Sequence, residues 1–86
     1  MPSPKNIVGP TVRQLRNKAG LSQPQLAAKC QMIGWDLSRE ILAQIESQFR
    51  YVTDWELVVL ARALHVEITD LIPAKFRKGR KLPNPE

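Results

Sequence analysis

The stretch 21–46, LSQPQLAAKCQMIGWDLSREILAQIE, predicts two short helices separated by a brief connection. Ser22 stands where it can cap the first helix, and Gln25, three residues later, completes the pattern of a capping box. Ser38 can cap the second helix by accepting hydrogen bonds from backbone N–H groups of its first turn. Gly34 marks the connection. Two capped helices in such close succession predict a helix-turn-helix.

Apolar residues recur at helical spacing behind both caps, so the two helices are expected to face a common core. These residues are Leu26, Ala27, Cys30 and Ile33 on the first helix and Leu42 and Ile45 on the second. The outward positions of the second helix are Arg39, Glu40, Ala43 and Gln44. On helical spacing alone, ordinary solvated side chains are the simpler interpretation. A short helix showing Arg and Gln to solvent is also suited to bonding base edges in a DNA major groove.

The rest of the chain also has the periodicity of helices and no strand-like alternation. A first helix is expected to open at Pro10 and Thr11, to end at Gly20, and to carry a stripe of Val12, Leu15 and Ala19. The second is expected to run to Ile33 and the third over about 39–47. A fourth is capped by Thr53 with Glu56 and has the stripe Leu57, Leu60, Ala61 and Leu64. One or two last turns, ended by Pro73, are expected at Ile68, Leu71 and Ile72.

We therefore expect an all-α, compact five-helix domain over residues 10–73, with an N-terminal arm at 1–9 and a basic, disordered tail at 74–86. At 86 residues there is room for one small domain. Its charge is polarised. Residues 1–50 carry seven basic side chains against three acidic ones, residues 51–74 one against four, and residues 75–86 five against one. A basic half that contains the outward-facing helix is the asymmetry expected if one end of the domain meets phosphates.

Composition argues against several other classes of protein. No apolar run approaches the ~20 residues of a membrane span and the start is polar, so a soluble cytoplasmic protein is expected. The single cysteine, Cys30, excludes an internal disulfide and is best interpreted as a small core residue. The sole histidine, His65, has no second ligand near it in the sequence. Without a glycine-rich phosphate loop or a Cys/His cluster, we expect no enzyme activity, metal, cofactor or small-molecule ligand.

With its helices in this order, the chain resembles the Cro and lambda-repressor-like helix-turn-helix family of XRE-type transcriptional regulators. The resemblance covers about residues 10–72. It rests on VRQLRNKAGLSQPQLAAK, LSREILAQIE and TDWELVVLARALHVEITDL. It implies a sequence-specific double-stranded DNA-binding regulator, with repression as the default, that reads the major groove with its third helix. The alternative is a protein-interaction module of the same fold, such as an antitoxin or a phage accessory protein. RNA binding is a weaker third choice, because the stacking aromatics used for single strands are absent.

The resemblance also implies roles for individual residues. Base reading falls to Arg39, Glu40 and Gln44, and contact with the DNA backbone to Gln23, Ser38, Ala43 and Arg50. Arg16 and Glu46 match the family's structural ion pair and are not expected to read bases. Five basic residues of the tail are candidate non-specific DNA contacts, with a merely solubilising terminus as the alternative. They are Lys75, Arg77, Lys78, Arg80 and Lys81.

Three departures from the family pattern are visible. Residues 31–36, QMIGWD, replace what is commonly a single glycine, so either the turn is enlarged or the preceding helix is longer by about a turn. Gln48 and His65 stand where glycines often end helices, which predicts left-handed backbone or different helix ends.

Trp35 is expected to pack the insert onto the helix pair, with a DNA or partner contact as the alternative. Trp55 and Val59, four residues apart and off the predicted core stripe, are candidate contacts of a homodimer.

Overall fold

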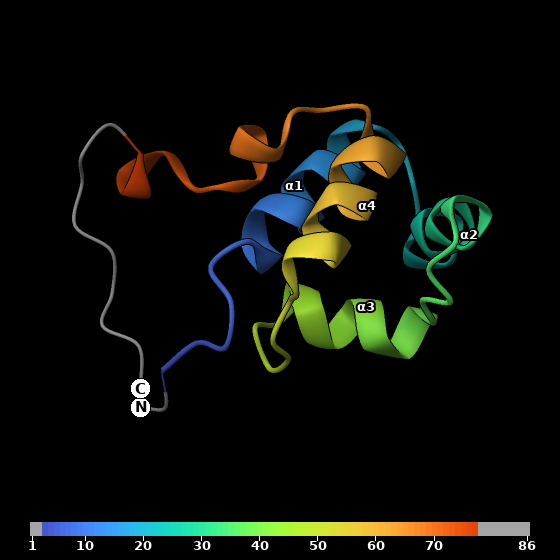
Figure 1. Ribbon diagram of the computed structural model, residues 1–86, viewed down its shortest axis with the longest axis horizontal. Helices are drawn as coiled ribbons and strands as arrows, with labels where there is room; N and C mark the ends of the chain where they lie inside the picture. Colours follow the sequence, from blue (N-terminus) through green and yellow to red (C-terminus); the bar gives the residue numbers. More distant parts are fainter. Residues whose placement is uncertain (1–2, 78–86) are drawn as a thin grey trace.

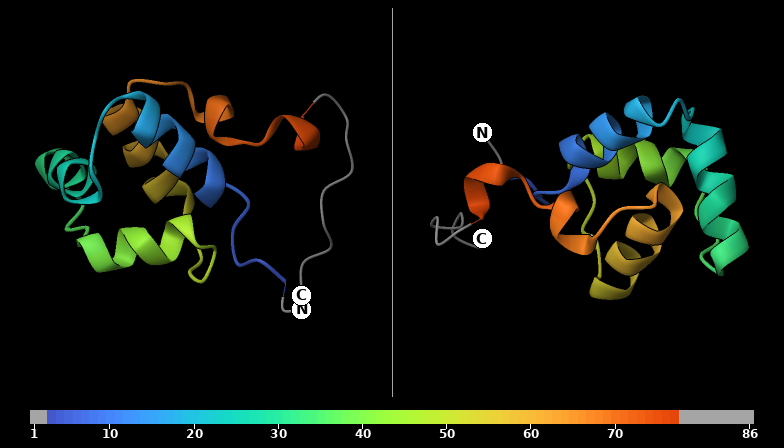
Figure 2. Two further views of the ribbon diagram at one scale, coloured as in Figure 1. Left: turned by 180° about the vertical axis from the view of Figure 1, so that it is seen from behind. Right: turned by 90° about the horizontal axis from the view of Figure 1, so that it is seen from above.

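The computed structural model describes residues 3–77. Four α-helices are followed by two short 3₁₀ helices, and residues 3–77 contain no strand. The elements are α1 Gly9–Lys18, α2 Gln23–Ile33, α3 Arg39–Glu46, α4 Asp54–Leu64, η1 Ile68–Leu71 and η2 Ala74–Phe76. Helices α1 and α4 form the centre, α3 lies beneath them, and α2 stands across one end (Figure 1; Figure 2). Each of α2 and α1 packs on both α3 and α4.

The all-α prediction is confirmed, but the expected fifth helix is only a single 3₁₀ turn. Leu71 is its one buried residue, and Ile68 is 44% exposed. Ile72 takes an extended backbone (φ −83°, ψ 125°) because the residue before a proline is disfavoured in the helical region. Beyond Pro73, residues 74–76, which the sequence placed in the tail, form η2. None of the helices within 3–77 is long and apolar enough to cross a membrane.

The predicted helix boundaries are largely confirmed by the caps. The Ser22 and Thr53 hydroxyls each accept from the backbone N–H three residues on, and both capping boxes are complete. Ser38 caps α3 by accepting from the Ile41 N–H at 3.1 Å. The non-glycine residues Gln48 and His65 do take left-handed backbone, with φ of 66° and 58°. Each accepts a cost of about 1 kcal/mol there.

The core is formed where the four helices meet and is almost entirely aliphatic. Its buried members are Val8, Val12, Leu26, Ala27, Cys30, Trp35, Leu37, Leu42, Ile45, Val59, Leu60, Ala61, Ala63, Leu64 and Leu71. Burial raises the pKa of the Cys30 thiol to about 11, as expected for a core residue.

The burial predicted from the sequence is wrong for three residues. Val59 is only 2% exposed, because α4 is covered by α2, α1 and η1 and buries a wider arc than its predicted stripe. Ala19 lies just past the end of α1 and is exposed. Ile33, the last residue of α2, is 36% exposed. Residues at helix ends can extend past the core and stay exposed to solvent even when their spacing matches the apolar stripe.

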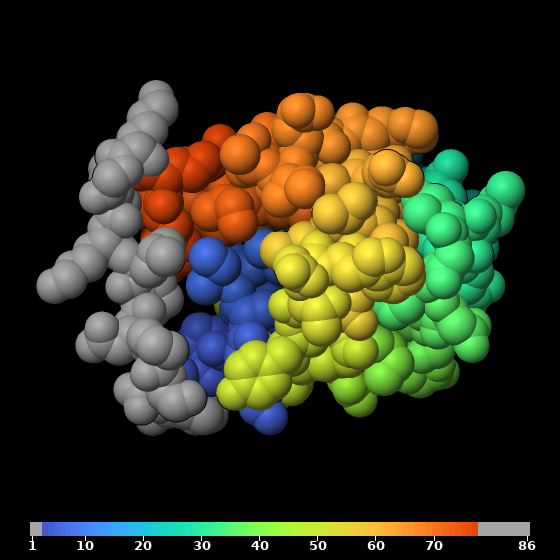
Figure 3. Space-filling model, viewed as in Figure 1, coloured from blue at the N-terminus to red at the C-terminus, as the bar shows by residue number. Residues whose placement is uncertain are grey.

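The insert at 31–36 is resolved as a longer α2 followed by a short turn. Helix α2 runs to Ile33, and Gly34 ends it in a left-handed conformation (φ 117°). The Trp35 N–H then bonds back to the Cys30 carbonyl at 3.0 Å. The Trp35 ring is buried and meets the Trp55 ring edge-on, with centroids 6.4 Å apart. Helices α2 and α4 pack together and lie side by side on the face shown in Figure 3. The packing role predicted for Trp35 is confirmed.

Candidate nucleic-acid interface

Helix α3 has one face in the core and one in solvent. Leu42 and Ile45 are fully buried. Arg39, Glu40 and Gln44 are exposed, with Ala43 half-buried beside them. The three ion pairs among residues 3–77 do not involve Arg39 or Glu40. The predicted base-reading side chains therefore share one surface, and the cationic and acidic groups on it are not neutralised by an ion pair within the described residues.

The buried carboxylate of Glu46 ties the end of α3 to α1 and α2. Arg16 donates from Nε to Oε2 at 2.7 Å and from Nη2 to Oε1 at 3.1 Å. The Gln23 amide donates to Oε1 at 3.0 Å, and Arg13 Nε reaches the same oxygen at 3.4 Å. The Glu46 side chain is 0% exposed and that of Arg16 is 11% exposed. The structural ion pair expected from the resemblance is confirmed, and it is joined by two further donors.

These contacts set the ionisation of Glu46. Burial opposes the charged form, but the hydrogen bonds from Arg16, Gln23 and Arg13 and the charge of Arg16 outweigh it, so the pKa lies below its ordinary value. The pKa of Glu56 is also lowered, because bonds from Arg50 and Thr53 outweigh the burial of that carboxyl. Both carboxylates are thus held in the charged form by specific donors.

Two predicted backbone contacts, Gln23 and Arg50, already hold protein carboxylates. Gln23 opens α2 and bonds Glu46. Arg50 forms a two-pronged pair with Glu56, at 3.1 and 3.2 Å, and also donates to the Tyr51 carbonyl. The guanidinium of Arg50 is therefore engaged with α4, and its expected contact with phosphate stays a prediction.

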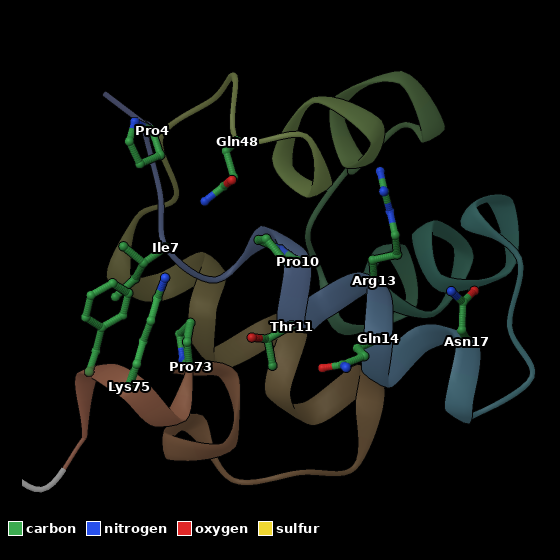
Figure 4. A pocket seen from close by; sticks show the side chains of 11 residues that line it. Pro4, Ile7, Pro10, Thr11, Arg13, Gln14, Asn17, Gln48, Pro73 and Lys75 are labelled. Carbon is green, nitrogen blue, oxygen red and sulfur yellow. The ribbon is translucent and has the colours of Figure 1, made fainter. Parts of the chain in front are cut away.

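A clamp between the N-terminal arm and the end of α3 was missed by sequence reasoning. The Asn6 amide donates to the carbonyls of Ile45 at 3.1 Å and Arg50 at 2.8 Å, while its oxygen accepts from the Gly9 N–H at 2.7 Å. The Gln48 amide donates to the Asn6 carbonyl at 2.9 Å. Gln48 lies beside the arm in Figure 4. One asparagine thus satisfies three backbone groups and fixes the loop that follows α3.

Gly9 allows the start of α1 to lie directly against the backbone at the end of α3. A Cβ atom at Gly9 would lie 2.2 Å from the Ile45 carbonyl oxygen and 3.0 Å from that of Glu46. Both are backbone atoms, so a side chain here would push the two helices apart. This requirement explains a glycine at the first position of α1, where its conformational freedom is not needed.

A groove of about 630 Å³ lies between the arm, α1 and η2 (Figure 4). Lys75 and Phe76 line its η2 side, whereas Arg13 extends from α1 toward α3. Arg77 donates back to the Ile72 carbonyl at 2.9 Å. Lys75 belongs to η2 and Arg77 follows it, and η2 lies apart from α3, the helix that carries the predicted reading surface (Figure 1). The other tail candidates, Lys78, Arg80 and Lys81, lie outside the described residues.

Two packed helices, joined by a short turn and with the second exposing a polar face, define a helix-turn-helix domain. The restriction-modification controller protein C.AhdI from Aeromonas hydrophila is 32% identical to this chain, with a TM-score of 0.68, over 76% of this chain and 91% of that protein. This chain belongs to the Cro and lambda-repressor-like helix-turn-helix family. The clp gene regulator ClgR from C. glutamicum shares the fold, with a TM-score of 0.69 and 21% identity over 83% of this chain and 86% of that one. No family model matches the sequence, and no curated protein matches it either.

Proposed function

We propose that this protein is a sequence-specific double-stranded DNA-binding regulator of transcription that reads the major groove with α3. The observation that carries the proposal is the outer face of α3, where Arg39, Glu40 and Gln44 are exposed while the inner face is fixed in the core. The proposal is supported by similarity to a controller protein and a gene regulator.

The chemistry of the three side chains suits different bases. Arginine bonds guanine O6 and N7 in two-pronged fashion, and glutamine does the same with adenine N6 and N7. Glu40 either accepts from a cytosine N4–H, orients Arg39 or repels phosphate. Because α3 is tied to α1 and α2 through Glu46, little backbone freedom is lost when the helix binds.

Contacts with the DNA backbone are proposed for Gln23, Ser38, Ala43 and Arg50. Gln23 spends one amide N–H on Glu46 and keeps a second for a phosphate oxygen. Arg50 would have to share its guanidinium between Glu56 and phosphate.

We further propose a repressor that acts by occupying a promoter as a homodimer. One short helix reads only a few base pairs, and two-fold proteins favour half-sites about one helical turn apart. Trp55, at 51% exposure, is the proposed dimer contact, whereas Val59 is buried and is withdrawn from it. The same exposed ring would serve the alternative of a protein-interaction module.

Replacing Arg39 or Gln44 by alanine should each cost about 1–3 kcal/mol of specific affinity and relax the preference at one base pair. The binding site is first selected from a random DNA pool, where a dimer should yield an approximate inverted repeat. Arg62→Ala on α4 and Gln14→Ala on α1 remove the same side chains from exposed positions elsewhere and should leave binding unchanged. Tight binding by both α3 variants would show that α3 does not read bases as proposed.

The tail is proposed as a non-specific electrostatic arm. Truncation after Ala74 removes five basic residues. Each phosphate contact contributes roughly 0.9 to the slope of log affinity against log salt, so losing two or three contacts should make the slope shallower by about 2–3 with the same preferred sequence. An unaltered slope across a salt series would assign the tail to solubility alone.

A further inference from the structure

Large aromatic side chains stand exposed just past the end of α3. Phe49 is 71% exposed and Tyr51 is 64% exposed, although both belong to the loop that joins α3 to the core helix α4. The loop backbone is fixed, since the Phe49 N–H bonds the Gln44 carbonyl at 2.9 Å and Asn6 holds the Arg50 carbonyl. Two exposed aromatic rings, two residues apart on a fixed loop, are candidates for contact with a partner.

Lys5 is held beside the Tyr51 ring. Its backbone N–H donates to the Gln48 carbonyl at 3.1 Å, and its ammonium nitrogen lies 5.6 Å from the centre of the Tyr51 ring. Lys5 is exposed and takes part in none of the three ion pairs formed within residues 3–77. The arm therefore presents a positive charge beside the Tyr51 ring, at a place where the guanidinium of Arg50 is paired with Glu56.

The position of this group relative to α3 indicates what it would meet. Eight helical residues span about 12 Å, which is also the approximate width of the B-DNA major groove. When α3 lies in the groove, groups just beyond its end reach the sugar-phosphate wall. A lysine ammonium complements phosphate, and aromatic rings pack on the apolar faces of deoxyribose.

We propose that Lys5, Phe49 and Tyr51 form a second contact with the DNA backbone, in which Lys5 supplies a cation in addition to the guanidinium that Arg50 shares with Glu56. This inference rests on the proposed function. Asn6 and Gln48 are positioning residues, because their hydrogen bonds hold the arm against the loop and so place Lys5.

The test compares variants on the DNA sequence that the parent protein selects. Lys5→Ala should lower affinity about two- to fivefold near physiological salt and make the salt slope shallower by roughly 0.9, with unchanged base preference. Phe49→Ala and Tyr51→Ala should weaken binding to a similar degree at all salt concentrations. Arg62→Ala is the charge-matched control, and unfolding curves check that each variant is folded.

A double variant separates positioning from a merely structural role. Asn6→Ala should flatten the salt slope as Lys5→Ala does, and adding it to Lys5→Ala should flatten the slope no further. An Asn6 that only stabilises the fold would change the melting temperature and leave the slope alone.

Three results would overturn the inference. The first is a Lys5→Ala protein with parental affinity and slope. The second is a shallower salt slope in Arg50→Gln with an unchanged slope in Lys5→Ala, which would show that Arg50 alone supplies the cation. The third is loss of dimer in sedimentation for the Phe49 and Tyr51 variants, which would assign the loop to a second copy of the chain. Failure of the parent to select any sequence would instead refute the proposed function.

Discussion

Replacing Glu46 by alanine should lower the free energy of unfolding by about 3–5 kcal/mol, because it strands the buried guanidinium of Arg16 without its partner. A domain of this size has a total stability of roughly 4–13 kcal/mol, so the variant should be largely unfolded if the parent lies at the lower end of that range and measurably less stable elsewhere in it. Denaturant and thermal unfolding followed by circular dichroism measure the loss. Asp36→Ala removes an exposed carboxylate and should change stability little. Equal unfolding of the Glu46 variant and the parent would show that the ion pair contributes nothing.

Acidification should reproduce part of this loss in the unaltered protein. The folded-state pKa values of Glu46 and Glu56 both lie below the ordinary value of 4.5. Their contribution is therefore complete above pH 4.5 and is lost as the pH falls below it, through the lowered pKa values. The stability of the Glu46→Ala protein should decline less over that range. Parallel pH profiles for the two proteins would contradict the assignment.

Replacing Gly9 by alanine should cost about 3 kcal/mol, at the upper end for overpacking, because the new Cβ would meet backbone oxygens that cannot turn aside. Gly20→Ala is the control. Its φ of 74° is strained for alanine, but nothing lies within 4 Å of the added atom, so about 1 kcal/mol is expected. Chemical denaturation of the two variants distinguishes steric contact from backbone strain. A Gly9 variant no less stable than the Gly20 variant would mean that α1 and α3 can separate easily.

Local chemistry made much of the fold predictable from sequence. The caps at Ser22, Ser38 and Thr53 depend on groups three residues apart, and the structure has all three. The burial of Val59 was not predictable from the apolar stripe of α4, because it depends on α1, α2 and η1 covering α4 together.

The same distinction holds for the candidate interface. The outward face of α3 follows from helical periodicity within eight residues. The side chain of Asn6 bonds the carbonyls of Ile45 and Arg50, which lie 39 and 44 positions further along the chain, so no local sequence pattern predicts this clamp. Nor does spacing show that Arg50 is held by Glu56 on the next helix. Contacts between distant segments decide which cations remain available to DNA.

Cys30 gives a means of timing the opening of this domain. It is the one thiol in the sequence, it is 0% exposed, and it lies in α2 at the centre of the core. Alkylating reagents attack the thiolate, so a pKa of about 11 and the absence of access both protect it in the closed protein. The rate of alkylation under native conditions then reports how often α2 leaves its neighbours. If added DNA slows the alkylation of Cys30, the ratio of the two rates measures how much the bound duplex suppresses the opening of α2.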